Sequence, residues 1–323
     1  MPLWIASLLG VVEGLTEFLP VSSTGHLILA DRLLGGAGAG DASFDIVIQL
    51  GAVLAVLLHY RKLLVERAAG VVRRDPVATR LLVALIVAFL PVAVIGLLVR
   101  HAVKEHLFGL VPVAAALIVG GIVMIGVERW LKANPKRAAL DGLEHVTAKR
   151  ALAIGFAQCA ALWPGTSRSM ATIVAGQLTG LTTATAAEFS FLLALPALGA
   201  ATVFEGWKAR HELLAGAGGP ALLVGLVTSF FVAWWALASF LSYVKRRGVE
   251  PFGYYRVVLG VAILLFLVEA DGPRRSSTLE QALPLHGDVV RSLAHDVYRL
   301  AELPCQPAGG PLLPGTGQGE PLP

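Results

Sequence analysis

Residues 20–25 read PVSSTG, and they interrupt an apolar run that extends from Leu3 to Leu34. This run is longer than the roughly 20 residues that one membrane helix needs, and a proline among polar residues ends a helix. We therefore expect two half-helices. A helix that stops inside hydrocarbon leaves backbone groups unpaired unless protein or water meets them, so the break is expected to line a cavity.

A second apolar run, Ala151–Leu181, is broken in the same way at residues 164–167, which read PGTS. It is also too long for one helix, and it also contains a proline next to a glycine and hydroxyl side chains. We predict a second pair of half-helices here.

The whole chain is too poor in charge to build a water-facing surface. Of its 323 residues, 56% are hydrophobic and 15% are charged, against about 25% charged in ordinary globular proteins, and the mean hydropathy is +0.72. No basic run with interleaved aromatic residues indicates a nucleic-acid partner. The two cysteines, Cys159 and Cys305, predict neither a disulfide framework nor a thiolate metal site. These features indicate an integral membrane protein surrounded by lipid.

Apolar segments outside the two broken runs predict six transmembrane helices. They are Ile46–Tyr60, Leu81–Val99, Gly109–Val127, Phe189–Phe204, Pro220–Val244 and Tyr254–Val268.

The connections between these segments differ in charge. Lys and Arg number 6, 6 and 3 in the connections 61–80, 128–150 and 244–253, and 1, 2 and 2 in 28–44, 100–108 and 206–219. Because positive loops stay in the cytoplasm, the first three are assigned there. Six spans then alternate correctly only if both broken runs are re-entrant hairpins, the first entering from outside and the second from the cytoplasm. Both termini lie outside, and the two tips meet near the midplane.

The two halves of the membrane region resemble each other. The alignment pairs Pro20 with Pro164, Ser22 with Thr166, Ser23 with Ser167 and, within one residue, Asp45 with Glu188. Inverted repeats bind their ligands on discontinuous helices near the midplane. We predict an all-α integral membrane protein with six transmembrane helices plus two re-entrant helical hairpins, in a membrane domain of residues 1–270. Its two inverted repeats cover about 1–130 and 148–270.

Glu13 and Glu17 lie four residues apart on the first half-helix, so their carboxylates project from one face. An acidic side chain at the centre of a membrane helix costs on the order of 2.5–3.5 kcal/mol. A bound cation would offset this cost, and paired carboxylates are the ligands that Mg²⁺ or Ca²⁺ prefers. We expect both glutamates to hold a divalent cation.

Hydroxyl side chains and a histidine follow the first break. Ser22 and Ser23 are natural N-caps for a helix beginning near Thr24. The N-terminus of this second half-helix is a site for an anion such as phosphate. His26 lies one turn further on, and a histidine near hydroxyls and carboxylates is a candidate base or nucleophile.

Arg168 is the only charged residue among residues 151–187. Its planar guanidinium cannot lose its proton, and its donor fork suits phosphate oxygens. The neighbours that complete an anion cradle at this tip are Gly165, Thr166, Ser167 and Ser169. Two carboxylates, an arginine and two helix N-termini around one cavity predict a site for a metal–phosphate complex.

Two motifs carry a resemblance to a known family. The stretches EGLTEFLPVSSTGH at residues 13–26 and PGTSRS at residues 164–169 resemble the signature motifs of bacterial undecaprenyl-diphosphate phosphatases, also called bacitracin-resistance proteins. The resemblance covers about residues 3–270 and includes FDIVIQLG at 44–51 and EFSFLLA at 188–194.

The resemblance implies an enzyme of the bacterial plasma (inner) membrane that hydrolyses undecaprenyl diphosphate to undecaprenyl phosphate and phosphate. This reaction recycles the lipid carrier of peptidoglycan synthesis and confers bacitracin resistance. In that family a divalent cation is required, and the glutamates and histidine of the first motif and the arginine of the second determine activity. These residues correspond here to Glu13, Glu17, His26 and Arg168.

The nucleophile stays open at this point between His26, Ser23 and water. A phosphohistidine or an acid-stable phosphoserine would identify the first two. The first hairpin enters from outside, so we expect the site to open to the extracytoplasmic side while the polyprenyl tail stays among lipid chains. The sequence leaves the oligomeric state open, with a homodimer as one expectation.

Two other functions compete with hydrolysis of the lipid diphosphate. A polyprenyl-phosphate flippase or transporter would also use inverted repeats with broken helices. A phosphatase of the phosphatidic-acid type has similar serine, histidine and arginine motifs, but position 174, where its second histidine is required, is Val174.

Residues 271–323 form a C-terminal extension that the family resemblance does not cover. The last 21 residues, from Leu303, contain 6 Pro and 5 Gly, which is typical of disorder. We expect this extension to be largely disordered and dispensable for activity.

Overall fold

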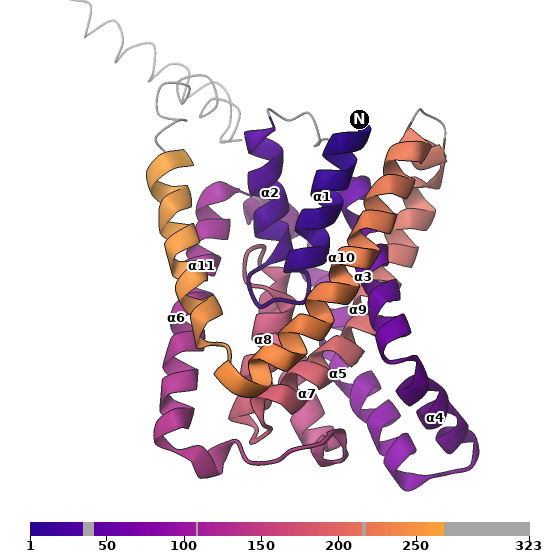
Figure 1. The fold of residues 1–323 in the computed structure, drawn as a ribbon, viewed down its shortest axis with the longest axis vertical. Coiled ribbons are helices and arrows are strands. Elements are labelled where there is room, and N and C mark those ends of the chain that lie inside the picture. The colour runs from indigo at the N-terminus through magenta and orange to yellow at the C-terminus, as the bar shows by residue number, and fades with distance from the viewer. Residues whose placement is uncertain (35–41, 108, 215–217, 268–323) are drawn as a thin grey trace, which may run out of the picture. The chain divides into compact units, whose positions relative to one another are not determined.

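Helices account for the regular structure of the described chain, and no strand occurs in it (Figure 1). The computed structural model describes residues 1–34, 42–107, 109–214 and 218–267. These residues belong to one unit, Met1–Ala270. The extension predicted for 271–323 lies outside the described residues.

The elements follow one another with short connections. They are α1 Leu3–Thr16, α2 Ser23–Leu33, α3 Ala42–His59, α4 Arg61–Val72, α5 Pro76–His106, α6 Leu110–Ala133, η1 Pro135–Arg137, η2 Leu143–His145, α7 Ala148–Gln158, η3 Cys159–Leu162, α8 Arg168–Leu178, α9 Thr183–Leu214, α10 Gly218–Arg247, α11 Glu250–Ala262 and η4 Ile263–Leu267.

Four of the described helices are long and apolar enough to cross a membrane. These segments are Pro76–Val99 of α5, Leu110–Ala133 of α6, Thr183–Phe204 of α9 and Gly219–Arg247 of α10. They match four of the six spans predicted from the sequence. The membrane-protein class and the all-helical fold are therefore confirmed.

The other two predicted spans are less regular. Ile46–Tyr60 lies in α3, and the helix pair Val47–His59 and Arg61–Val72 is bent by 70° at Tyr60, so α3 and α4 together give at most a fifth candidate span. Tyr254–Val268 falls on α11 and η4, and its last residue lies outside the described part of the chain.

Both breaks predicted at the prolines are present. The first leaves residues 17–22 between α1 and α2, and the second leaves residues 163–167 between η3 and α8. Figure 1 shows α1 and α2 next to each other, joined by a loop at about half the height of the helical bundle. The chain turns back on itself at this loop, which places polar backbone deep among the helices.

Close packing of α1 on α10 fixes the direction of the first half-helix. A Cβ atom added to Gly14 would lie 2.7 Å from the carbonyl oxygen of Ser229, and one added to Gly10 would lie 2.5 Å from that of Gly225. Small residues let two membrane helices approach this closely. With its glycines against α10, α1 buries Glu13 and Glu17, which are 1% and 6% exposed.

Candidate active site

The break in each apolar run ends on a serine with an unusual backbone conformation. Ser22 has φ +77° and Ser167 has φ +71°, a left-handed region that costs a residue other than glycine about 1–3 kcal/mol. Each serine caps the following helix, because Ser22 Oγ accepts from the Gly25 amide at 3.3 Å and Ser167 Oγ accepts from the Met170 amide at 3.3 Å. The strained turns aim the N-termini of α2 and α8 at the space between the tips.

This shared conformation corrects the alignment of the two halves. The sequence alignment pairs Ser22 with Thr166 and Ser23 with Ser167, whereas the backbone makes Ser22 the counterpart of Ser167. The second tip therefore has one more residue between its proline and its cap. The shift places Ser23 and Arg168 at the same position, the first residue of α2 and of α8.

The carboxylate of Glu17 joins the two tips. Its Oε2 accepts a hydrogen bond from Ser23 Oγ at 2.6 Å and lies 3.4 Å from the amide nitrogen of Gln49. Its Oε1 pairs with Arg168 Nη2 at 3.3 Å. The side chains of Glu17 and Arg168 are 5% and 10% exposed, so this ion pair is largely desolvated. Three chain segments distant in sequence thus meet at one carboxylate.

The guanidinium of Arg168 is held from two sides. Its Nη1 donates to the backbone carbonyl of Ser190 at 2.9 Å, while its Nε has no partner among the described residues. Ser190 is itself fixed by Thr172, whose hydroxyl lies 2.6 Å from the Ser190 hydroxyl. The bonds to Ser190 and Glu17 use two of the five guanidinium N–H groups, so donors are left for a further acceptor, as an arginine that binds phosphate requires.

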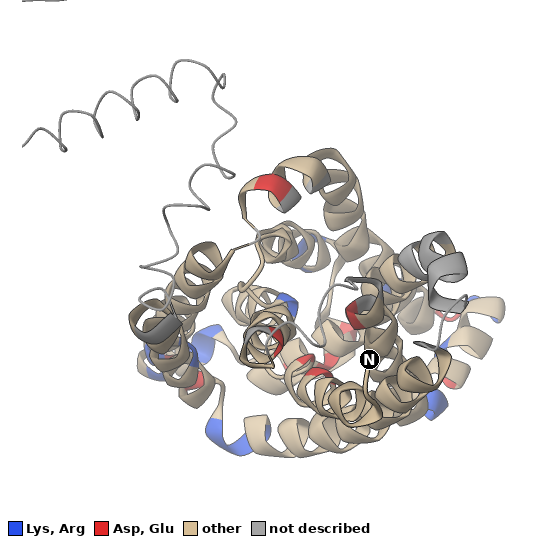
Figure 2. Ribbon diagram, turned by 90° about the horizontal axis from the view of Figure 1, so that it is seen from above, with Lys and Arg blue, Asp and Glu red and all other residues tan. Residues whose placement is uncertain are grey.

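A cavity of about 150 Å³ opens beside these groups. Its lining includes seven residues predicted from the sequence: Glu17, Ser22, Ser23, Thr24, Gly165, Ser167 and Arg168. The remaining lining residues are Gln49, Ala161, Pro164 and Leu198. Seen from above, most of the ribbon is tan, and only a few segments among the central helices have the colours of charged residues (Figure 2).

Four predicted residues lie close by without lining this cavity: Glu13, His26, Thr166 and Ser169. Ser169 is fully buried, and its hydroxyl donates to the Leu19 carbonyl at 3.0 Å, so it ties the two tips together. The Thr166 amide closes the turn by donating to the Trp163 carbonyl at 3.1 Å.

His26 is turned toward α11. Its Nδ1 lies 2.7 Å from the carbonyl oxygen of Ser22, and its Nε2 lies 2.7 Å from the hydroxyl of Tyr255. Since a carbonyl only accepts, Nδ1 carries a hydrogen in this arrangement. The imidazole and the Tyr255 ring are also stacked, with centroids 5.7 Å apart. Both ring nitrogens are thus engaged outside the cavity.

Arg256 is a buried charge that the sequence reading passed over. It is 0% exposed, and its guanidinium donates to the carbonyls of Pro20 at 3.2 Å, Gly165 at 3.0 Å and Ala116 at 3.1 Å. It therefore joins the first tip, the second tip and α6. The signal was available, because Arg256 is the one charged residue in the predicted span Tyr254–Val268, as Arg168 is in its own run.

Gln49 was also missed as a site residue. It is a polar side chain within the predicted span Ile46–Tyr60, and its amide reaches Glu17 from α3. A polar residue in an apolar span is the signal that would have identified it.

The donor set at the first tip suits a divalent cation bound together with a phosphate ligand. No group of three or more His, Cys, Asp or Glu side chains able to hold a metal occurs within the described residues. Glu13 and Glu17 interact electrostatically, and Glu13 Oε1 is buried with no hydrogen-bond partner among the described residues. Mg²⁺ is commonly held by one or two carboxylates plus substrate phosphates and water, so the two glutamates fit.

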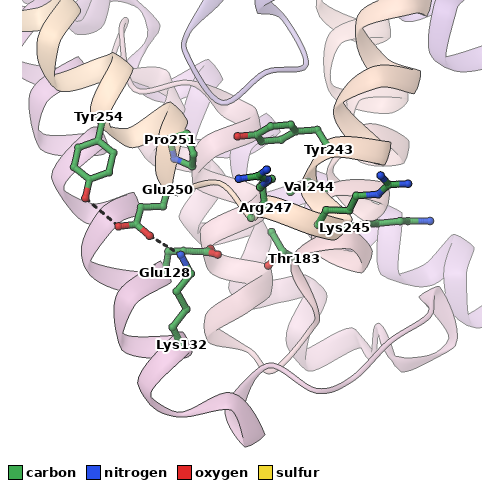
Figure 3. Close-up of a pocket in the computed structure, with 12 residues that line it drawn as sticks. Glu128, Lys132, Thr183, Tyr243, Val244, Lys245, Arg247, Glu250, Pro251 and Tyr254 are labelled. Carbon is green, nitrogen blue, oxygen red and sulfur yellow. Dashed lines mark hydrogen bonds and ion pairs between the residues drawn. The ribbon is translucent and has the colours of Figure 1, made fainter.

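A larger cavity of about 690 Å³ lies where the ends of α6, α10 and α11 meet (Figure 3). Figure 3 shows Glu250 between Lys132 and the hydroxyl of Tyr254, and Arg129 also pairs with Glu250 at 3.0 Å. Hydrogen bonds from Lys132, Arg129 and Tyr254 lower the pKa of Glu250 to about 2. None of the predicted site residues lines this cavity, so the chemistry is assigned to the smaller one.

The sequence is similar to that of bacterial relatives along most of its length. An undecaprenyl-diphosphatase of Sorangium cellulosum is 60% identical over 260 residues, which is 80% of this chain and 84% of the relative. Undecaprenyl-diphosphatases of Rhizorhabdus wittichii and Thermoanaerobacter pseudethanolicus are 45% and 44% identical, covering 81% and 82% of this chain and 96% of each relative. The model of the family described as bacitracin resistance protein BacA matches residues 6–262. With its two broken-helix tips meeting at Glu17, the chain belongs to the BacA bacitracin-resistance family.

Proposed function

We propose that this chain is a membrane phosphatase that hydrolyses undecaprenyl diphosphate to undecaprenyl phosphate and inorganic phosphate. The observation that carries the proposal is the meeting of Ser23 and Arg168 on the Glu17 carboxylate inside one cavity. A nucleophile, a base and a phosphate-binding cation within hydrogen-bond reach are the parts that phosphoryl transfer needs. The reaction returns the lipid carrier to peptidoglycan synthesis, which accounts for bacitracin resistance.

Ser23 is the nucleophile of this proposal. Its hydroxyl gives its proton to Glu17 Oε2 while its Oγ attacks the terminal phosphorus. The bond from that phosphorus to the bridging oxygen breaks, and undecaprenyl phosphate leaves with the proton that Glu17 took from Ser23. Water then attacks the phosphoserine while Glu17 takes a proton from the water, and Glu17 gives this proton to Ser23 Oγ as phosphate leaves. The 2.6 Å contact between Ser23 and Glu17 supports these proton transfers.

Arg168 and the tips stabilise the transition state. The charge of the transferring phosphoryl group spreads over its oxygens, and guanidinium and backbone donors directed at them lower the barrier. The partnerless Nε of Arg168 and the amides at the start of α2 and α8 are the donors. Ser22, Thr24, Gly165 and Ser167 shape the wall around the phosphate.

Glu13 and Glu17 would hold the divalent cation, Mg²⁺ or Ca²⁺. When bound, it supplies positive charge beside the diphosphate. The buried partnerless oxygen of Glu13 supports this assignment. In addition, Glu13 interacts electrostatically with Glu17, Asp45 and Arg168, and a bound cation would offset the repulsion between the carboxylates when they are ionised.

His26 is assigned a positioning role. Its contacts with Ser22 and Tyr255 hold the first turn of α2, which carries Ser23.

The proposed topology has six crossings and two re-entrant pairs, α1 with α2 and α7 with α8, arranged as inverted repeats. Both termini and the opening of the active site face the extracytoplasmic side. The asymmetry of Lys and Arg between the two sets of connections supports this orientation. A homodimer belongs to the same proposal and is checked by light scattering of the purified protein.

Acid-quenched turnover with a diphosphate labelled in its terminal phosphate tests the mechanism. We expect an acid-stable phosphoserine on Ser23 in the wild type and in His26→Ala, and none in Ser23→Ala. An acid-labile phosphohistidine, detected after an alkaline quench, would instead make His26 the nucleophile. We expect Glu17→Ala and Arg168→Ala to lose phosphate release, whereas a wild type that binds the substrate and releases no phosphate would contradict the enzyme and favour a flippase or transporter.

A further inference from the structure

An apolar groove of about 550 Å³ runs between α5 and α9 and begins at Arg168. Among its fourteen lining residues, only Gln158 and Arg168 are polar. Its other walls come from one face of α5, from α9 and from the η3 turn. It is therefore an apolar surface with a cation at one end.

Small side chains create the groove. On α9, Ala197, Ala200 and Ala201 are spaced by three and four residues and so share one face. On α5, Ala93 and Gly96 face them, and a Cβ added to Gly96 would meet only one atom within 4 Å, Leu162 Cδ2 at 3.3 Å. Because both helices carry small residues where they face each other, the groove stays open along their contact.

The groove is continuous with the active-site cavity. Ala161, Arg168 and Leu198 line both. A ligand with an anionic head and an apolar chain would therefore lie with its head against Arg168 and its chain between α5 and α9.

We propose that this groove holds the isoprene units nearest the diphosphate and makes the enzyme sensitive to prenyl chain length; the inference rests on the proposed function. A cavity of roughly 300–1,000 Å³ encloses a drug-sized ligand, so the groove takes the first part of the chain while the remainder lies among lipid. Because lipid is as apolar as the groove, moving the chain from lipid into the groove adds little binding free energy. The groove instead fixes the direction in which the chain leaves the phosphate at Arg168.

A second apolar groove provides the internal control. It has about 580 Å³, is lined mainly by α5, α6, η3 and α8, and shares no lining residue with the active-site cavity. Val123 on α6 lines it and is 43% exposed. The two grooves are similar in size and polarity, and they differ in their connection to Arg168.

The experiment measures phosphate release from undecaprenyl diphosphate, the long substrate, and from methyl diphosphate, a short substrate without an isoprene unit, at one fixed detergent mole fraction. The variants Ala201→Trp and Gly96→Leu narrow the proposed groove from its two walls, and Val123→Trp fills the control groove. For the long substrate we expect the first two variants to lower kcat about tenfold, since a misplaced chain misplaces its phosphate. For the short substrate, kcat/KM should stay within twofold of wild type, and Val123→Trp should leave both unchanged.

The proposal is overturned if the properly inserted groove variants affect both substrates equally or neither. It is also overturned if Val123→Trp selectively impairs the long substrate, which would place the chain along α6. A single-peak elution and a wild-type unfolding temperature identify inserted variants, and either groove variant suffices. Failure of the proposed function is a separate result, in which the wild type releases phosphate from neither substrate.

Discussion

Arg168 and Glu17 form an ion pair that is almost removed from solvent, and each partner also has a second task. Arg168 holds the Ser190 carbonyl, and Glu17 accepts the Ser23 hydroxyl. Pairing two charges offsets the cost of burying them, and the same geometry brings a guanidinium next to a nucleophile. At this scale, structural and chemical roles belong to the same side chains.

Arg168→Lys tests the importance of the guanidinium shape. A lysine keeps the charge, but its single ammonium lacks the planar fork that reaches Glu17, Ser190 and a phosphate oxygen together. We expect kcat to fall about 10²-fold, comparable to removing one donor from a transition-state site. Arg129→Lys, on the exposed pair with Glu250, is the matched control and should retain activity. Equal activity of both variants would contradict the role of Arg168.

Arg256→Met tests whether a buried arginine without a carboxylate partner positions the two tips. The variant leaves the carbonyls of Pro20, Gly165 and Ala116 without their donor, at about 1–3 kcal/mol for each unsatisfied group, partly offset because a buried charge is removed. We expect kcat to fall about tenfold because the donors at the tips move relative to Glu17. Steady-state kinetics and thermal unfolding are both measured. Loss of stability with an unchanged kcat would assign Arg256 a purely structural role.

The half-helices are short elements that depend on their neighbours. Helices α2 and α8 have eleven residues each, and each follows a strained serine. Isolated helices of this length are only marginally stable. Packing against other helices stabilises this region. Helix α1 packs on α10, and the ring of Phe18 beside the first tip contacts that of Phe191 on α9 edge to face, with centroids 5.2 Å apart. Packing against the long helices therefore holds the tips in place.

Gly14→Leu tests the contact between α1 and α10. The added side chain collides with the backbone at Ser229, and overpacking of this kind costs about 1–3 kcal/mol. We expect a lower unfolding temperature in detergent and reduced activity, since Glu13 and Glu17 lie on the same half-helix. Gly126→Leu on α6 is the control, because a Cβ there meets no atom within 4 Å. Equal stability of the two variants would show that the close approach is unimportant.

At the scale of the whole molecule, the described helices and the family match end at nearly the same place. The family model extends to residue 262, and the unit that contains the site ends at Ala270. The site is built from α1, α2, α3, α8 and α9, with Arg256 of α11 supporting both tips. Every described residue of the site therefore precedes residue 271.

Truncation at Asp271 is expected to leave kcat and KM within twofold of the full chain, because every described residue of the site precedes this point. Phosphate release by purified full-length and truncated protein is the measurement, with membrane insertion verified for both. A truncated chain that inserts normally and is inactive would show that the extension takes part in function.

Much of the site was predictable because charge is rare in this sequence. Glu17 and Arg168 were identified as isolated charges in apolar runs, and the structure brings them into contact. Arg256 satisfies the same rule and was missed because its run was read as an ordinary span. His26 was placed near the hydroxyls by its sequence spacing, but a rotation around α2 turns it toward Tyr255.

The sequence by itself determined the membrane class, the four long apolar helices and the two proline breaks, because hydrocarbon penalises charge and unpaired backbone wherever they occur along the chain. Only the tertiary structure decided which side chains line the cavity and which support it. Contacts such as that between Glu17 and Arg168 join residues 151 positions apart. Their geometry depends on how α1, α8 and α11 pack, and local sequence patterns do not encode that packing.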